Sequence, residues 1–154
     1  MKVTEFLSPN AVVAELRGSS KHDVLRELAE RLAQAYGGTL RADRVLEVLG
    51  EREKLASTGI GEGVAIPHGK MPGLDRLYAA FGVSHAGVDF ASIDKRPTQL
   101  FFALVAPENS AGIHLKALAR ISRLFRGAPL RDSILAAHGA EDIYRLIAEE
   151  DARA

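Results

Sequence analysis

The sequence contains no cysteine among its 154 residues, and this absence excludes three kinds of chemistry. There is no disulfide, no thiolate nucleophile and no zinc site with cysteine ligands. A protein without disulfides suits a reducing cytosol, where thiols are kept reduced. Any reactive group must therefore belong to another residue type.

Long apolar runs are also missing. Nowhere do eighteen apolar residues follow one another, so the sequence predicts no membrane-spanning helix. The opening residues, MKVTEFLSPNAVVAELRGSSKHD, lack the unbroken apolar centre of a signal peptide. Together these features predict a cytoplasmic protein that does not insert into a membrane.

Neither sign of charge is in excess, because twenty Lys and Arg balance twenty Asp and Glu. Nucleic acids and anionic membranes attract proteins with surplus basic residues, so neither is expected as the main partner. The composition, 47% hydrophobic and 26% charged, is that of an ordinary globular protein. The length suits one domain that spans residues 1–154.

Helical spacing dominates the first third of the chain. Ser20 is placed to cap a helix, Asp23 lies in its first turn, and Gly37 and Gly38 follow its last turn. The apolar stripe of this helix comprises Val24, Leu25, Leu28, Leu32 and Ala35. A second stripe in residues 41–55 comprises Val45, Leu46 and Leu49. That stripe places Arg52 near the end of the second helix.

The helical spacing of apolar residues then gives way to short apolar runs, and it returns in the last third of the chain. Residues 63–67, 76–84 and 98–107 are short apolar runs typical of strands. Helices are predicted over 112–127, over 129–139 from Pro129 to Gly139, and over 140–150, before a short tail, EEDARA, that is expected to fray. The apolar stripe of the first comprises Leu115, Leu118, Ile121, Leu124 and Phe125. Helices, strands and helices in this order predict an α/β sandwich.

The stretch STGIGEGVAIPHGK, residues 57–70, holds four glycines and matches neither common phosphate-binding motif. A P-loop counted from Gly63 needs its second glycine at position 68, which is histidine, and Met71 stands where the Ser or Thr should be. A dinucleotide fingerprint that begins at Gly59 meets Val64 in place of its third glycine. Both motifs are excluded.

The same stretch is well suited to display a histidine. Its glycines allow a left-handed backbone that leads into a short strand, and Pro67 fixes φ just before His68 at the exit of that strand. Gly69 removes a side chain that would crowd an incoming group. A largely neutral imidazole can then act as a nucleophile while an acceptor holds its other nitrogen. The alternative is a simple turn after a strand, which is the commoner role of Pro-His-Gly.

Two blocks of the sequence carry a family resemblance. EREKLASTGIGEGVAIPHGK resembles the signature of fructose/mannitol-type enzyme IIA components of the bacterial phosphotransferase system, and ASIDKRPTQLFFALVAPENSAGIHLKALARISRLF resembles that family's second block. The likeness runs from about residue 7 to 147. The opening of the chain is most similar to the nitrogen-regulatory branch. The resemblance implies a central mixed β-sheet flanked by helices.

The resemblance also assigns roles to individual residues. His68 matches the phosphorylated nucleophile, His114 the second active-site histidine, and Arg52 the arginine that grips phosphate oxygens. A place for His114 at a helix start would be favourable, because free amides there attract anions. Ser57 and Thr58 are candidates to donate hydroxyl hydrogen bonds at the rim, although a simple turn explains them nearly as well.

Other polar residues are interpreted as structural. His22, His85 and His138 match nothing in the two blocks, and His138 before Gly139 suits a helix C-terminus. A zinc site from His68, His85 and His114 lacks any closely spaced ligand pair, so no metal is expected. Asp89 and Asp94 are typical of loops and turns.

Glu62 departs from the family pattern, in which asparagine is frequent at this position. A carboxylate within reach of a phosphorylated His68 would repel it, whereas an outward-pointing carboxylate would only tune partner choice. The position therefore bears on the rate of transfer and not on the identity of the nucleophile.

Three functions are compatible with these residues. The first is a regulatory phosphocarrier without cofactors, phosphorylated by an HPr-type protein, whose downstream partners are potassium-transport or sensor-kinase proteins. The second is a sugar-pathway enzyme IIA that passes the phosphoryl group to a separate enzyme IIB. The third is a binding module that has lost phosphorylation, against which the retained Arg52, His68 and His114 argue.

Overall fold

The computed structural model describes residues 1–154 and contains one six-stranded mixed sheet. The strands, in chain order, are β1 (Leu7–Val13), β2 (Gly59–Gly61), β3 (Val64–Ala65), β4 (His68–Met71), β5 (Tyr78–Val88) and β6 (Thr98–Pro107). The helices are the short 3₁₀ helix η1 (Val3–Glu5), then α1 (Lys21–Ala35), α2 (Ala42–Leu55), α3 (Ala111–Phe125), α4 (Ala128–Leu135) and α5 (Ala140–Arg153).

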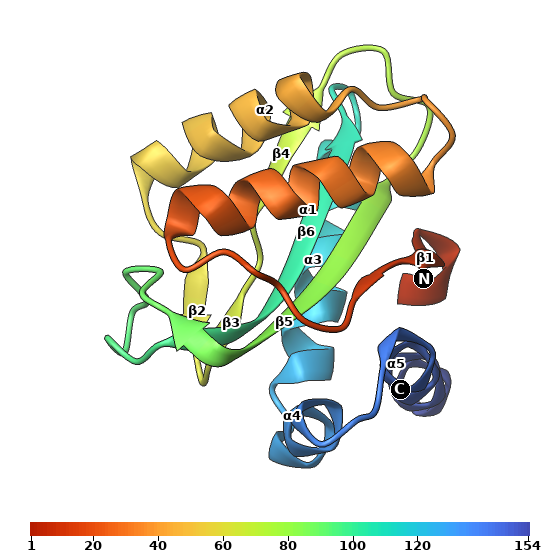
Figure 1. Cartoon of the computed structure of the whole chain (residues 1–154). Coiled ribbons are helices and arrows are strands. Elements are labelled where there is room, and N and C mark those ends of the chain that lie inside the picture. Colours follow the sequence, from red (N-terminus) through yellow and green to blue (C-terminus); the bar gives the residue numbers. More distant parts are fainter.

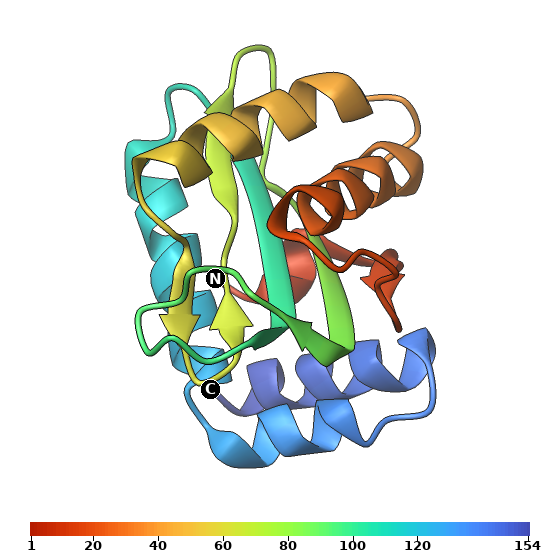
Figure 2. The same cartoon turned by 60° about the vertical axis from the view of Figure 1, so that its left-hand side comes forward.

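Helices cover both faces of the sheet, which makes an α/β sandwich. α1 and α2 lie across one face, α3 lies behind the other, and α5 packs near β1 with α4 beside it (Figures 1 and 2). One cluster of 41 buried apolar residues fills the interior. None of the helices is long and apolar enough to cross a bilayer.

β6 is the central strand, and two short strands share one of its edges. β5 pairs antiparallel with β6 on one side, and β1 pairs parallel with β5 beyond it. On the other side, β3 pairs with residues 100 and 101 of β6, while β4 pairs with residues 104–107. Pro67 lies between β3 and β4, where its missing N–H interrupts the ladder. This break introduces His68.

The predicted helix signals are confirmed in the first half of the chain. Ser20 caps α1, its side chain accepting a hydrogen bond from the amide of Asp23 at 3.2 Å. The predicted stripe faces the core, with Val24, Leu25, Leu28 and Leu32 buried. Gly37, just after α1, has φ of 62°, a conformation that glycine adopts without steric cost.

Four sequence predictions about the elements were wrong or incomplete. Leu115 is 67% exposed, because His114 takes the buried position in the first turn of α3. The tail does not fray: α5 runs to Arg153, and the buried Asp151 accepts hydrogen bonds from Arg120 at 2.8 and 3.0 Å. α4 ends at Leu135, and Gly139 is the N-cap of α5. Three strands, β1, β2 and β4, were not predicted.

Candidate active site

His68 is the first residue of β4, and hydrogen bonding fixes which of its ring nitrogens is free. Nδ1 lies 2.7 Å from the carbonyl oxygen of Ile66. Because a carbonyl oxygen only accepts, Nδ1 carries the proton in a neutral ring. The lone pair is then on Nε2, and the half-buried ring keeps that nitrogen without a hydrogen-bond partner in the protein. A nucleophile needs such a free lone pair.

The electrostatic environment keeps His68 neutral. Burial lowers the pKa of His68 below its ordinary value of 6.5, and the positive charge of Arg52 lowers the pKa further. The hydrogen bond to Ile66 and the negative charge of Glu53 act in the opposite direction but do not prevail. The imidazole is therefore uncharged at neutral pH, which is the state able to attack phosphorus.

His114 meets His68 from the other side of the site, as the sequence predicted for a helix start. It lies in the first turn of α3, and the two imidazole rings stand edge to face with centroids 5.4 Å apart. His114 is only 6% exposed, and its Nε2 is buried without a hydrogen-bond partner. Burial, the proximity of a second titratable ring at His68 and the positive charge of Lys70 lower the pKa of His114 to about 4.

Arg52 lies in the last turn of α2, at the end predicted from the helical stripe. One N–H of its guanidinium donates to the carbonyl oxygen of Ala56 at 2.7 Å. No carboxylate pairs with Arg52, so most of its donors remain available. A planar guanidinium with free donors matches the oxygens of a phosphoryl group.

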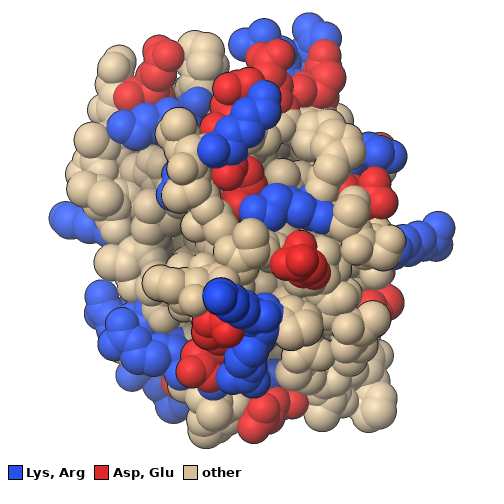
Figure 3. Space-filling model, turned by 90° about the vertical axis from the view of Figure 1, so that its left-hand side faces the viewer, with Lys and Arg blue, Asp and Glu red and all other residues tan.

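The three predicted residues line one open cleft of about 580 Å³ between α2, β4 and the start of α3. Its other lining residues include acidic, basic and apolar side chains: Glu47, Val48, Glu51, Leu55, Gly69 and Lys70. On the face of the molecule shown in Figure 3, acidic and basic side chains form mixed groups with uncharged surface between them. No single sign of charge dominates the cleft.

Gly69 lines the cleft and also packs against α2. A Cβ at this position would lie 2.3 Å from Cγ1 of Val48, a distance that no real contact allows. The missing side chain therefore lets α2 pack closely against β4. This close packing brings Arg52 and His68 to one cleft, which Gly69 also lines.

Ser57 and Thr58 do not line the cleft. The hydroxyl of Ser57 donates to the carbonyl oxygen of Phe90 at 2.6 Å and accepts from the amide of Gly59 at 3.0 Å. Thr58 is buried, and its hydroxyl donates to the carboxylate of Glu53. Both hydroxyls thus hold the chain between α2 and β2.

Glu62 points outward. Its carboxylate lies 3.5 Å from Arg131 and 3.8 Å from Arg96, and its side chain is 64% exposed. Its φ of 58° is left-handed, between the glycines at 61 and 63, which have φ of 94° and 76°. Of the two orientations considered for this residue, the structure has the one that leaves His68 unopposed.

The remaining polar residues lie apart from the cleft. His85 contacts Glu15 and the carbonyl oxygen of Leu135, so the three histidines of the zinc alternative do not come together. No group of three His, Asp or Glu side chains is arranged to hold a metal. Asp89 and Asp94 accept hydrogen bonds from amides two residues further on, as turn residues do. His138 precedes α5 and does not end a helix.

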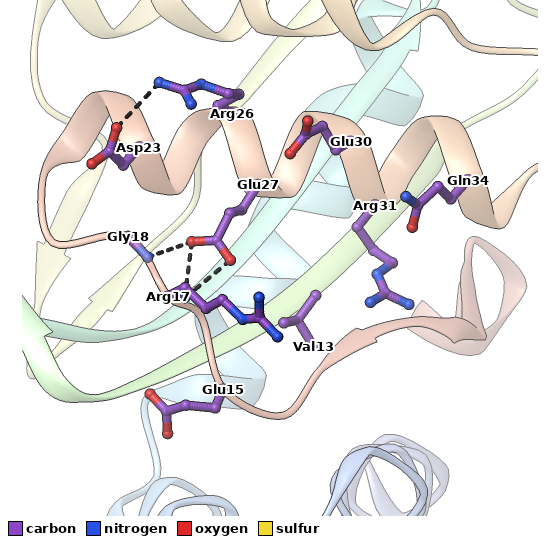
Figure 4. Close-up of a pocket in the computed structure, with 10 residues that line it drawn as sticks. All are labelled: Val13, Glu15, Arg17, Gly18, Asp23, Arg26, Glu27, Glu30, Arg31 and Gln34. Carbon is purple, nitrogen blue, oxygen red and sulfur yellow. Dashed lines mark hydrogen bonds and ion pairs between the residues drawn. The ribbon is translucent and has the colours of Figure 1, made fainter.

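A second groove of about 550 Å³ runs between α1 and the chain that follows β1 (Figure 4). Two of its carboxylates are occupied: Glu27 accepts from the amides of Arg17 and Gly18, and Asp23 pairs with Arg26. None of the predicted site residues lines it. Of the two grooves, the His68 cleft is the one that contains a histidine nitrogen without a hydrogen-bond partner beside free guanidinium donors.

Two residues near His68 were missed by sequence reasoning. Lys70 lines the cleft, and its spacing of two from His68 on a strand was the available signal, because alternate residues share a face. Glu53 is buried beneath the site, with 4% of its side chain exposed. A charged residue in an amphipathic helix is normally solvated, so no sequence signal marked it.

The comparisons with known proteins show the family of the chain. The family model described as "Phosphoenolpyruvate-dependent sugar phosphotransferase system, EIIA 2" matches residues 5–150. A protein of Bradyrhizobium diazoefficiens named "Nitrogen regulatory protein" is 43% identical over 96% of this chain and 95% of its own length. The "PTS system fructose-specific EIIABC component" of Bacillus subtilis is 35% identical, with 98% of this chain matching 24% of that protein.

A solved structure extends the match to three dimensions. The nitrogen regulatory protein IIA-Ntr from Neisseria meningitidis superposes with a TM-score of 0.86 at 33% identity, over 94% of this chain and 98% of that one. Sequence and fold therefore lead to one assignment. The chain belongs to the enzyme IIA type 2 family of the phosphoenolpyruvate-dependent phosphotransferase system.

Proposed function

We propose that this chain is a regulatory phosphocarrier of the cytoplasm in which Nε2 of His68 accepts a phosphoryl group from the phosphohistidine of an HPr-type protein. The whole chain acts as one enzyme IIA unit. The observation that carries the proposal is the 2.7 Å hydrogen bond from Nδ1 of His68 to Ile66, which leaves Nε2 as the free nucleophilic nitrogen.

The transfer balances without a separate proton carrier. The lone pair of Nε2 forms a bond to phosphorus as the phosphorus–nitrogen bond of the donor breaks. A donor ring protonated on its other nitrogen leaves as neutral imidazole. His68 keeps its proton on Nδ1, which continues to donate to Ile66. Because the transition state of such a transfer is loose, the protein mainly positions the groups and stabilises charge.

Three features are placed to stabilise the incoming charge, which approaches two negative units by analogy with other phosphorylated side chains. The guanidinium of Arg52 has free donors. The first turn of α3 has no side-chain cap, so its amides are available to an anion. Nε2 of His114 lacks a partner and would gain one from a phosphoryl oxygen if it carries the proton.

The regulatory role is favoured by relatives named as nitrogen regulatory proteins. In this proposal, phosphorylation at His68 controls binding to downstream proteins of potassium transport or to sensor kinases. Binding of such candidates to the phosphorylated protein and to His68→Ala protein tests this part. Equal affinity for the two forms would contradict it.

A second function is favoured by the relative named for fructose transport. In that function the same nucleophile passes the phosphoryl group to a separate enzyme IIB. Incubation of the phosphorylated chain with isolated enzyme IIB domains separates the two roles, because only a sugar-pathway protein transfers its phosphoryl group to such a domain at a useful rate.

The direct test is intact mass after incubation with phosphoenolpyruvate, enzyme I and HPr. We expect one acid-labile phosphoryl group on the wild type and none on His68→Ala protein. If the wild type stays unmodified while a known enzyme IIA is labelled in parallel, the chain is a binding module and not a phosphocarrier.

A further inference from the structure

The carboxylate of Glu53 is buried beneath the cleft and has no part in the phosphoryl transfer described above. Its side chain is 4% exposed and lies in the last turn of α2, next in sequence to Arg52. Three donors surround it: Nζ of Lys21 at 2.8 Å, the amide of Thr58 at 3.1 Å and the hydroxyl of Thr58. A buried carboxylate needs such partners, because burial removes it from water.

The hydrogen bonds continue from Thr58 to the nucleophile. The carbonyl oxygen of Thr58 accepts from the amide of Ile66 at 3.0 Å. The carbonyl oxygen of Ile66 then accepts from Nδ1 of His68 at 2.7 Å. One connected series therefore runs from Glu53 in α2, through the chain before β2, to the ring of His68 in β4.

The Ile66 carbonyl depends on this series for its direction. Ile66 lies between β3 and β4, and no backbone amide donates to its carbonyl oxygen. Its peptide bond joins Pro67, which has no N–H. The amide of Ile66 bonds to Thr58, and the carbonyl of Pro67 bonds to the amide of Leu104. Loss of the Thr58 anchor would leave one side of this segment unheld.

From this geometry we propose that Glu53 and Thr58 are positioning residues, which hold the Ile66 carbonyl so that His68 keeps its proton on Nδ1 and offers its lone pair at Nε2. The proposal rests on the proposed function, since the consequence of the tautomer is the rate of phosphorylation. Neither residue touches the phosphoryl group. Each acts through Ile66.

A purely stabilising role would give a different pattern of effects. The ion pair with Lys21 alone would make Glu53 a structural link between α1 and α2. Two of the three donors to Glu53, however, belong to Thr58, the residue that holds Ile66. A structural link predicts lower stability with an unchanged tautomer, whereas positioning predicts a changed tautomer.

The experiment compares four variants with the wild type. Thr58→Val removes the hydroxyl at nearly constant shape, Thr58→Ser retains a hydroxyl, and Glu53→Gln removes the charge. Asp151→Asn is the matched control, because it breaks another buried ion pair, to Arg120, at the far end of the chain. Long-range nitrogen–proton NMR of the imidazole reports the tautomer of His68 in each protein, and denaturant unfolding reports stability.

We expect Nδ1 protonated in the wild type, in Thr58→Ser and in Asp151→Asn, and a mixture of tautomers in Thr58→Val and Glu53→Gln. Phosphorylation by phospho-HPr should slow about three- to ten-fold in the last two, the effect of one lost hydrogen bond, through kcat and not KM. If Glu53→Gln fails to fold, the two substitutions at Thr58 still decide the question.

Two results would overturn the proposal: an unchanged tautomer in both Thr58→Val and Glu53→Gln, or an equal change in Asp151→Asn. The tautomer is measured on the unphosphorylated protein. An unmodified wild type in the mass experiment would therefore contradict the proposed function and leave this measurement intact, so the two failures are distinguishable.

Discussion

His68 and His85 lie in the same sheet, on β4 and β5, yet their surroundings give them opposite properties. One nitrogen of His68 faces an acceptor and the other faces the cleft. Both nitrogens of His85 face acceptors: Nδ1 contacts the carboxylate of Glu15, and Nε2 lies 2.9 Å from the carbonyl oxygen of Leu135. Two acceptors are both satisfied only by the doubly protonated ring.

The pKa shifts of the two histidines follow from these contacts. Burial lowers the pKa of His68, whereas the hydrogen bond to Glu15 and the one to Leu135 raise the pKa of His85. His68 is thereby kept neutral with a free lone pair, and His85 is favoured as a cation with none. A histidine becomes a candidate nucleophile through the number of its acceptors and its burial, not through its presence near a glycine.

The largest expected effect comes from replacing each of the two histidines in turn and comparing the rates of phosphorylation. His68→Asn should abolish phosphorylation by phospho-HPr, because no lone pair remains at the cleft. His85→Asn should be phosphorylated at the wild-type rate, since its ring has no free nitrogen to contribute. Radiolabel transfer measured for both proteins checks this. Labelling of His68→Asn would show that the nucleophile is another residue.

Removal of the free guanidinium should have the next largest effect. Arg52→Gln is expected to slow phosphorylation about 10- to 100-fold, less than the loss of a fully enclosed oxyanion donor because the cleft is open. Arg52→Lys keeps the charge but loses the planar fork, so its rate of phosphorylation should lie between those of the wild type and Arg52→Gln. Arg145→Gln, on the exposed surface of α5, is the control. Equal rates for Arg52→Gln and Arg145→Gln would exclude Arg52 from the site.

The burial of His114, the second histidine of the cleft, can be tested by the pH dependence of stability. His114 has a pKa of about 4 in the folded protein and about 6.5 when unfolded, so below pH 6.5 the unfolded chain binds the extra proton. The free energy of unfolding should therefore decrease by roughly 3 kcal/mol as the pH is lowered from 6.5 to 4, because of this residue. Urea unfolding across this range measures the slope.

The His114→Gln protein isolates that contribution, because all carboxylates titrate equally in the two proteins. Its stability should depend less steeply on pH between 6.5 and 4 than that of the wild type. Parallel curves for the two proteins would mean that His114 is protonated as readily in the folded state as in the unfolded state.

The sequence predicted long elements better than short ones. The stripes of α1 and the apolar runs of β5 and β6 each extend over seven or more residues, enough for a period to emerge. β2, β3 and β4 have three, two and four residues, too few to show alternation. β1 contains Ser8, Pro9 and Asn10, residues that are depleted in strands, and it lies at the sheet edge where they are tolerated.

The site was predictable only in part. The resemblance pointed to Arg52, His68 and His114, and the structure brings all three to one cleft. Thr58 was expected at the rim and instead bonds to the buried Glu53. Tertiary contacts decide which charged residue of a helix is buried, so the series from Glu53 to His68 emerges only when α2 and β2 are placed.

The smallest expected effect is the contribution of His85 to stability, which is lost as the pH rises, whereas that of His114 is lost as the pH falls. Because the folded pKa of His85 is raised, its link to Glu15 stabilises the protein fully below pH 6.5 and loses this contribution as pH rises through the folded pKa. Both side chains are about half exposed, so His85→Gln should cost only about 0.5 kcal/mol at pH 6. At pH 9 the variant and the wild type should unfold at the same urea concentration.

Glu15→Gln should reproduce the loss, and the double variant should add nothing further, because both changes remove one interaction. A loss that persists at pH 9 would mean that His85 holds α4 as a neutral ring, and the contrast with His68 would then rest on packing and not on charge.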